Sequence, residues 1–315
     1  MQKEIRAIEI CGISYQKKLN IMRCFLGGKE ISRNEVAEKC SLSEATAGKV
    51  ATALCEQGIL RIEKRPVGRG RRTEFFAPTE KLCGLVITVR EESLSANLLD
   101  LCENVIIDVC RKQSLSISSE GVANDFCAEL FSIIERMSEN IFFKVGILFD
   151  EGISPKVREK FKATICRYFD VDVTLEYKSA KLSALCRLYP SEVLLVVGVN
   201  ESLSLSLVCA NRVLPKRKTR SVYTHSNDPN RLVEEISALV CPMFDAVFPD
   251  RILIESHTFL ADRALRDALC ERIAKATGIP KEELPIIESN ANVDHAECEV
   301  LELLREKICI RLLGS

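Results

Sequence analysis

Residues 32–60 read SRNEVAEKCSLSEATAGKVATALCEQGIL, and residues 68–72 read GRGRR. Ser32 and Glu35 have the spacing of a capping box, in which a serine begins a helix and a glutamate three residues later bonds back to it. The pattern therefore predicts a short helix that starts at Ser32 and ends near Cys40.

A tight turn and a longer helix follow. Ser43 is placed to cap a helix that runs from Glu44 to about Gln57, and Gly58 is placed to end it. Four apolar residues at spacings of three and four form the predicted buried face: Ala47, Val50, Ala51 and Leu54. Three residues near the start of this helix are expected to point outward: Ala45, Thr46 and Lys49.

The segments on either side complete the module. Residues 17–27 have the apolar spacing of a helix that Gly27 and Gly28 end. Residues 59–63 and 73–77 read as two strands joined by the Gly-Arg tip at 68–72. A helix-turn-helix followed by a hairpin is a winged helix-turn-helix, which we expect over residues 1–80.

Charge is concentrated in this part of the chain. Residues 1–80 hold 15 lysines and arginines against 10 acidic residues, whereas the rest holds 29 against 35. Such a local basic excess is typical of a module that binds a polyanion. The third helix of a winged helix-turn-helix enters the major groove and the wing reaches phosphates or the minor groove. The residues predicted to contact double-stranded DNA are Arg33, Ser43, Ala45, Thr46, Lys49, Arg69, Gly70, Arg71 and Arg72. A winged helix that binds protein is the alternative.

Composition excludes several classes of protein. The 315 residues are 47% hydrophobic and 28% charged, with a net charge of -1, which argues against disorder and against a wholly basic nucleic-acid coat protein. The longest apolar runs, such as residues 193–199, are far shorter than the roughly 18 residues of a membrane span. We expect a cytoplasmic protein. The 15 cysteines include no Cys-x-x-Cys pair, so we read them mainly as reduced, small hydrophobes, with a metal site or redox regulation as the alternatives.

Residues 81–315 alternate strands with helices. Strand-like runs are expected at 84–89, 94–101, 105–109, 144–149, 171–175, 193–199, 203–208, 251–254 and 285–288. Helical spacing is expected at 123–137, 155–169, 180–188, 231–248 and 261–277, with a further helix at the C-terminus. This order predicts an α/β body of two similar lobes, at about 81–190 and 191–315.

The order of motifs resembles the ROK family of repressors and sugar kinases. The resemblance is carried by the segment at 32–60 with GRGRR, and by CGLVITV (83–89), VDVTLEYKSAKLSAL (171–185), VLLVVGVNESLSLSLVCANRVL (193–214) and LVEEISALVCPMFDAVFPDRILIES (232–256). It implies an actin-like, ribonuclease H-like body in two lobes that follows a DNA-binding head.

The body departs from the family where the kinases do their chemistry. Val86 and Thr88 stand where the resemblance implies a phosphate loop, and Tyr177 and Lys178 stand where it implies an Asn-Asp pair. Lysine cannot replace a carboxylate general base in the same geometry. The second phosphate turn reads VNES at 199–202, a late glycine pair is replaced by Glu255-Ser256, and the family's zinc segment is missing.

We therefore predict a regulator that is not an enzyme and needs no cofactor or metal. The three histidines, His225, His257 and His295, lie far apart in sequence, and His295 with Cys298 would offer only two metal ligands. We expect a homodimer on operator DNA, with a repressor role and an unidentified small-molecule effector. The alternatives are a DNA-anchored protein-interaction scaffold without a ligand, a divergent sugar kinase, and a regulator that responds to cysteine oxidation.

Overall fold

The computed structural model describes residues 7–8, 13–66, 72–112, 119–137, 142–199, 202–209, 212–222, 229–244, 246–255, 263–289 and 295–313. It divides into two compact units: residues 1–180 together with 296–315, and residues 181–295. Among the described helices, none is both long and apolar enough to cross a membrane.

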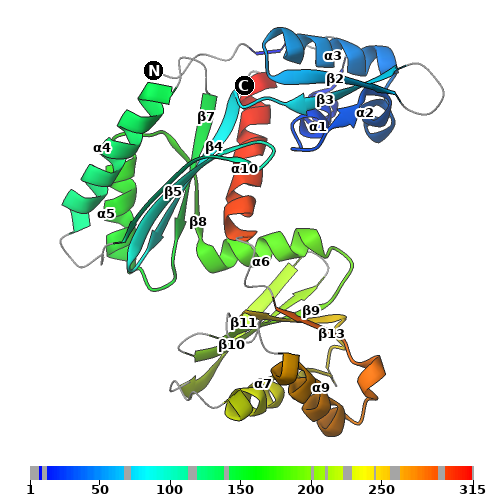
Figure 1. Cartoon of the computed structure of the whole chain (residues 1–315), viewed down its shortest axis with the longest axis vertical. Helices are drawn as coiled ribbons and strands as arrows, with labels where there is room; N and C mark the ends of the chain where they lie inside the picture. Colours follow the sequence, from blue (N-terminus) through cyan, green and yellow to red (C-terminus); the bar gives the residue numbers. More distant parts are fainter. Residues whose placement is uncertain are drawn as a thin grey trace. The chain divides into compact units, whose positions relative to one another are not determined.

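The first six elements form a small module that we call the head (Figure 1). They are α1 (Tyr15–Phe25), β1 (Ile31–Ser32), α2 (Arg33–Cys40), α3 (Glu44–Glu56), β2 (Leu60–Pro66) and β3 (Arg72–Pro78). The three strands make one antiparallel sheet in the order β1-β3-β2. The helices and the hairpin expected from the sequence are confirmed, with bounds within a few residues of those predicted.

A mixed five-stranded sheet fills most of the rest of the first unit. Its strands are β4 (Leu82–Arg90), β5 (Ser93–Asp100), β6 (Val105–Lys112), β7 (Phe142–Phe149) and β8 (Val171–Glu176), in the order β6-β5-β4-β7-β8. Strands β4 to β6 are antiparallel, while β4, β7 and β8 run parallel. Helices α4 (Ser119–Met137) and α5 (Pro155–Ile165) pack on one face of this sheet.

Helix α10 (His295–Leu313) packs on the opposite face (Figure 1). Two glycines on neighbouring strands make room for it. A Cβ atom on Gly84 would lie 2.5 Å from Leu301, and one on Gly146 would lie 2.2 Å from Val300. The helix therefore lies directly on the backbone of β4 and β7.

The second unit repeats this strand order. Its strands are β9 (Leu194–Val199), β10 (Ser202–Cys209), β11 (Arg212–Val222), β12 (Arg251–Glu255) and β13 (Ile286–Ser289), in the order β11-β10-β9-β12-β13. Again three strands are antiparallel and two are added in parallel. Helices α7 (Pro229–Phe244) and α9 (Arg263–Thr277) cover one face, residues of α6 (Tyr177–Leu188) pack on the other, and a short 3-10 turn, η1 (Lys281–Glu283), precedes β13.

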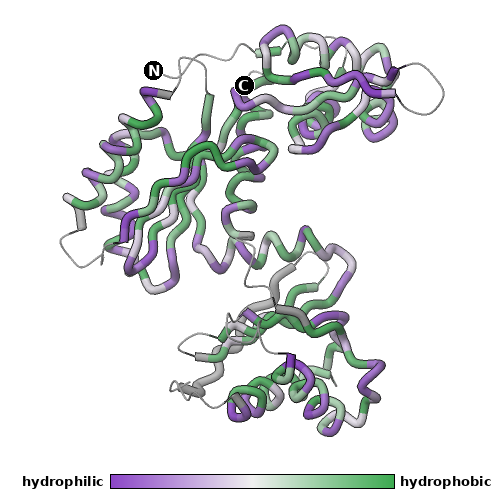
Figure 2. Tube along the Cα trace, in the orientation of Figure 1, coloured by the Kyte–Doolittle hydropathy of each residue, from purple (hydrophilic) through white to green (hydrophobic). Residues whose placement is uncertain are grey.

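The central strands of both sheets are covered by helices on both faces, and their residues are accordingly apolar. In Figure 2 the central strands of both sheets are hydrophobic along their length, as expected for strands covered on both faces. Strand β11 was not predicted. Its run of basic residues shows no apolar alternation, and its antiparallel pairing with β10 makes it a strand.

Candidate nucleic-acid interface

The start of α2 is fixed by the predicted capping box. The Glu35 amide donates to the Ser32 hydroxyl at 3.3 Å, and the Ser32 amide donates to the Glu35 carboxylate at 2.7 Å. The Ser32 hydroxyl also donates to the Glu35 carboxylate, at 2.8 Å. The two bonds from Ser32 to this carboxylate favour its ionised form, so they lower the pKa of Glu35 below its ordinary value of 4.5. The helix therefore begins at a defined residue.

A left-handed residue turns the chain from α2 into α3. Ser41 has φ 52° and ψ 57°, and its amide donates to the Glu38 carbonyl. Ser43 then caps α3, with its hydroxyl accepting from the Thr46 amide at 3.2 Å. A short polar residue can adopt the left-handed conformation, as Ser41 does, or cap a helix, as Ser43 does.

Helix α3 buries one side and exposes the other. All four residues predicted to face the core, Ala47, Val50, Ala51 and Leu54, are buried. Ser43, Ala45 and Lys49 are exposed and Thr46 is half-buried. The exposed residues of the first two turns are therefore small or polar, with one cation, Lys49, and one acidic residue, Glu44.

The β2–β3 hairpin adds further positive charge. Arg61, Lys64, Arg65 and Arg72 are exposed on it. The first three have acidic neighbours: Lys64 lies 3.1 Å from Glu74, Arg65 lies 2.9 Å from Glu30, and Arg61 lies 3.9 Å from Glu63. Within the described part of the chain, no ion pair is formed by Lys49 or Arg72. Arg69, Gly70 and Arg71 lie outside the described residues.

The half-exposed Arg33 side chain lies against the surface of the head. Its guanidinium forms an ion pair with Glu74 on β3 and lies 5.7 Å from the centre of the Phe76 ring. It also lies under α3, because a Cβ atom on Gly48 would be 3.5 Å from Arg33. Arg33 thus touches α3 and β3 from the first residue of α2, which its position in the sequence did not indicate.

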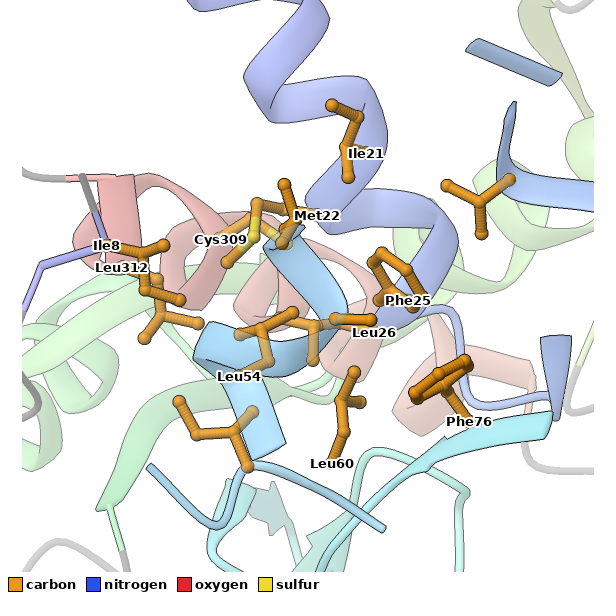
Figure 3. Close-up of a cluster of buried hydrophobic side chains, with 14 of the residues drawn as sticks. Ile8, Ile21, Met22, Phe25, Leu26, Leu54, Leu60, Phe76, Cys309 and Leu312 are labelled. Carbon is orange, nitrogen blue, oxygen red and sulfur yellow. The ribbon is translucent and has the colours of Figure 1, made fainter. Parts of the chain in front are cut away.

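A shared core fixes the head to the end of α10. Met22 and Phe25 of α1, and Leu26 directly after it, belong to the same buried cluster as Cys309 and Leu312 of α10 (Figure 3). Arg23 forms an ion pair with Glu306, and the Ile8 amide donates to the Leu312 carbonyl at 2.7 Å. The head is therefore packed against α10 through a common apolar core.

Two of the positions that depart from the expected kinase pattern lie beneath α10. Val86 and Thr88 are buried on the face of β4 that α10 covers. The Thr88 hydroxyl donates to the Glu297 carboxylate at 3.1 Å, and the Asn97 amide donates to the same carboxylate at 2.8 Å. A carboxylate in this place repels a phosphate group.

The structure also places Tyr177 and Lys178, which stand where the resemblance implies an Asn-Asp pair. The Tyr177 ring lies 5.5 Å from the Arg90 guanidinium, and Lys178 follows it in the first turn of α6. Residues 200–201 lie outside the described residues, as do His225 and His257, and the His295 side chain is not described. In the described part of the chain, no three histidine, cysteine or acidic residues are grouped as metal ligands would be.

Comparison with solved structures identifies the architecture. A ROK family transcriptional regulator, a homologue of the E. coli Mlc protein, superposes with a TM-score of 0.65 at 13% identity, over 95% of this chain and 98% of that one. The chain has the ROK family fold. Two further structures each superpose with a TM-score of 0.50, over 72% of this chain and 99% of their own. One is a ROK family protein from Streptococcus pneumoniae in complex with sucrose, at 10% identity, and the other is a ROK hexokinase from Thermus thermophilus, at 11% identity. No family sequence model and no curated protein sequence matches the chain.

The two sheets share one strand order, which agrees with the ROK fold of these neighbours. Both regulators and sugar kinases are built on this fold, so the fold does not choose between them. The choice depends on the residues of the head and on those of β4, β5 and α10 around Thr88, Asn97 and Glu297.

Proposed function

We propose that the chain is a DNA-binding transcriptional regulator of the ROK family, in which residues 1–80 form a winged helix-turn-helix. The observation that carries the proposal is the outward side of α3. It presents Ser43, Ala45, Thr46 and Lys49 on a capped helix, and a basic hairpin follows it. An α-helix of this kind fits the major groove of B-DNA, which is about 12 Å wide.

The extent of the structural match supports this proposal. The regulator superposes on 95% of the chain, whereas the sucrose complex and the hexokinase superpose on 72%. The difference is similar in size to the head. A fold that carries an additional N-terminal module of this size agrees with a regulator better than with a kinase alone.

The residues beneath α10 favour a regulator that does not transfer phosphate. A kinase needs groups that hold magnesium and the phosphates of a nucleotide, and a carboxylate that accepts the sugar proton. Here Glu297 bonds to Thr88 and Asn97, and lysine occupies position 178. We propose that the body serves dimerisation and effector binding in place of catalysis.

Two heads are needed for specific binding. One winged helix covers a few base pairs, whereas a two-fold dimer places two α3 helices in grooves about 34 Å apart. We propose a homodimer that represses transcription from a palindromic operator and that a small molecule releases by changing the spacing of the heads.

Selection from fragmented genomic DNA with the purified full chain tests the proposal. The expected result is an enriched palindrome with half-sites one helical turn apart. Binding that falls steeply with salt and enriches no sequence would contradict it, because phosphate contacts alone are independent of sequence. Phosphorylation of a hexose by MgATP in the same preparation would favour the kinase.

A further inference from the structure

Two cysteines of the head have their sulfur atoms in contact. Cys24 lies near the end of α1 and Cys40 is the last residue of α2, and the two sulfurs are 3.7 Å apart. Cys40 is buried at the edge of the head core, whereas Cys24 is half-buried. The fold thus brings together thiols that are 16 residues apart in sequence.

The pair needs only a small movement to form a covalent bond. A disulfide has a sulfur–sulfur distance of about 2.05 Å, so the sulfurs must approach by roughly 1.6 Å. Rotation of two cysteine side chains and a slight approach of the two helix ends supply a movement of this size. The half-buried Cys24 is the thiol that a small oxidant reaches first.

We propose that Cys24 and Cys40 form a reversible disulfide that controls the position of α3. The proposal rests on the DNA-binding function proposed above only for its effect on affinity, since the bond itself is independent of DNA. The oxidant is of the hydroperoxide class, such as hydrogen peroxide.

The chemistry balances in two steps. The Cys24 thiolate attacks a peroxide oxygen, the O–O bond breaks, and a sulfenic acid and hydroxide form. The Cys40 thiolate then attacks the Cys24 sulfur and displaces the sulfenic oxygen as a second hydroxide. The two thiol protons convert both hydroxides into water, while two electrons pass from the sulfurs to the peroxide.

Burial and the neighbouring Cys24 raise the pKa of Cys40 to about 11. Because the thiolate is the nucleophile, closure of the disulfide should accelerate as the pH rises toward the pKa of Cys40. We assign the first attack to Cys24 because it is the more exposed of the two thiols.

The position of Cys40 connects the bond to the DNA-binding surface. The next residue is Ser41, whose left-handed conformation turns the chain into α3, and the Leu42 amide donates to the Ala37 carbonyl of α2. Drawing Cys40 toward α1 displaces this turn, and α3 moves with it. We expect at least a tenfold loss of affinity for operator DNA on oxidation.

Peptide mapping of the full-length protein tests the bond. Trypsin cleaves after Arg23, Lys29, Lys39 and Lys49, so each thiol falls on its own peptide, CFLGGK and CSLSEATAGK. Non-reducing digestion after peroxide treatment is expected to yield these two peptides joined. The exposed Cys166, on peptide 163–167, reports whether the oxidant acted. Oxidation of Cys166 without the joined peptides, or a bond from Cys24 to Cys55 or Cys309 instead, would overturn the proposal.

Hydrogen exchange and DNA affinity test the consequence. Oxidation is expected to accelerate amide exchange over residues 41–57 and to lower affinity, and a thiol reductant is expected to reverse both. Cys24→Ser should abolish both responses, and Cys40→Ala, as a second variant, should do the same. Cys166→Ser makes the same change as Cys24→Ser at an exposed site and should retain both responses. Unchanged exchange in the crosslinked protein would overturn the proposed control. Absence of DNA binding by the reduced protein would contradict the proposed function and leave the exchange test decisive.

Discussion

A Cβ atom on Gly28 would lie 2.4 Å from the carbonyl oxygen of Leu101 and 3.1 Å from the Arg305 guanidinium. The loop after α1 therefore lies against the β5–β6 turn and α10 with no space for a side chain. Arg305 itself donates to the Leu101 carbonyl at 2.7 Å. The head, the first sheet and α10 converge at this point.

Gly28→Ala should destabilise the first unit. Gly28 has φ +78°, which costs an L-residue about 1 kcal/mol, and the close contact adds to this cost. Gly278→Ala is the matched control, because Gly278 has φ +74° and open space around it and should lose only the conformational part. Denaturant unfolding measures both variants, and equal losses would show that the contact with Leu101 carries no energy.

Lys49→Ala and Arg72→Ala should each weaken DNA binding. If the side chain contacts a phosphate, the slope of log affinity against log salt should flatten by about 0.9. If it contacts a base, the loss should be about 1–3 kcal/mol and confined to the operator. Lys160→Ala removes the same charge from an exposed position on α5 and should change neither quantity. Normal binding by both head variants would contradict the placement of DNA on α3 and the hairpin.

Arg33→Ala should lower DNA affinity without changing the salt slope. Arg33 was expected to contact DNA, but its guanidinium pairs with Glu74 and lies near Phe76, so we predict that it positions α3 and the hairpin. Glu74→Gln should then have a similar effect although it removes a negative charge. A flattened salt slope in Arg33→Ala, with Glu74→Gln binding more tightly, would instead favour a phosphate contact.

Stability should depend on pH through Glu35. The folded pKa of Glu35 is lowered, so its stabilising effect is complete above pH 4.5 and is lost as the pH falls through the folded pKa. The difference in free energy of unfolding between the unmodified chain and Glu35→Gln should therefore shrink below pH 4.5. Glu38→Gln is the control on the same helix, since the Glu38 side chain is exposed and makes no hydrogen bond to another described residue. A constant difference for Glu35→Gln would show that its bonds to Ser32 contribute nothing.

Local patterns in the sequence predicted the head well. The Ser32–Glu35 capping box, the Ser43 cap and the buried face of α3 depend on residues within one or two turns of each other, so spacing alone was sufficient. Contacts between distant residues could not be predicted in the same way. Thr88 and Glu297 are 209 residues apart, and nothing near either residue indicates the other.

The direction of Arg33 was missed for a related reason. A basic residue at the start of a helix suggests a solvent or phosphate contact, and only the folded hairpin places Glu74 and Phe76 beside it. The C-terminal helix was predicted, but its packing on β4 and β7 was not. Gly84 and Gly146, which make that packing possible, were the available signal.

The contribution of α10 to the head core has a consequence for biosynthesis. Helices α1 to α3 leave the ribosome early, but Ile308, Cys309 and Leu312 complete the apolar core around them and are synthesised long afterwards. The core around Met22 and Leu26 therefore stays incomplete during synthesis until α10 has been made. A chain truncated before α10 would therefore contain a head whose apolar core is open where Ile308, Cys309 and Leu312 otherwise close it.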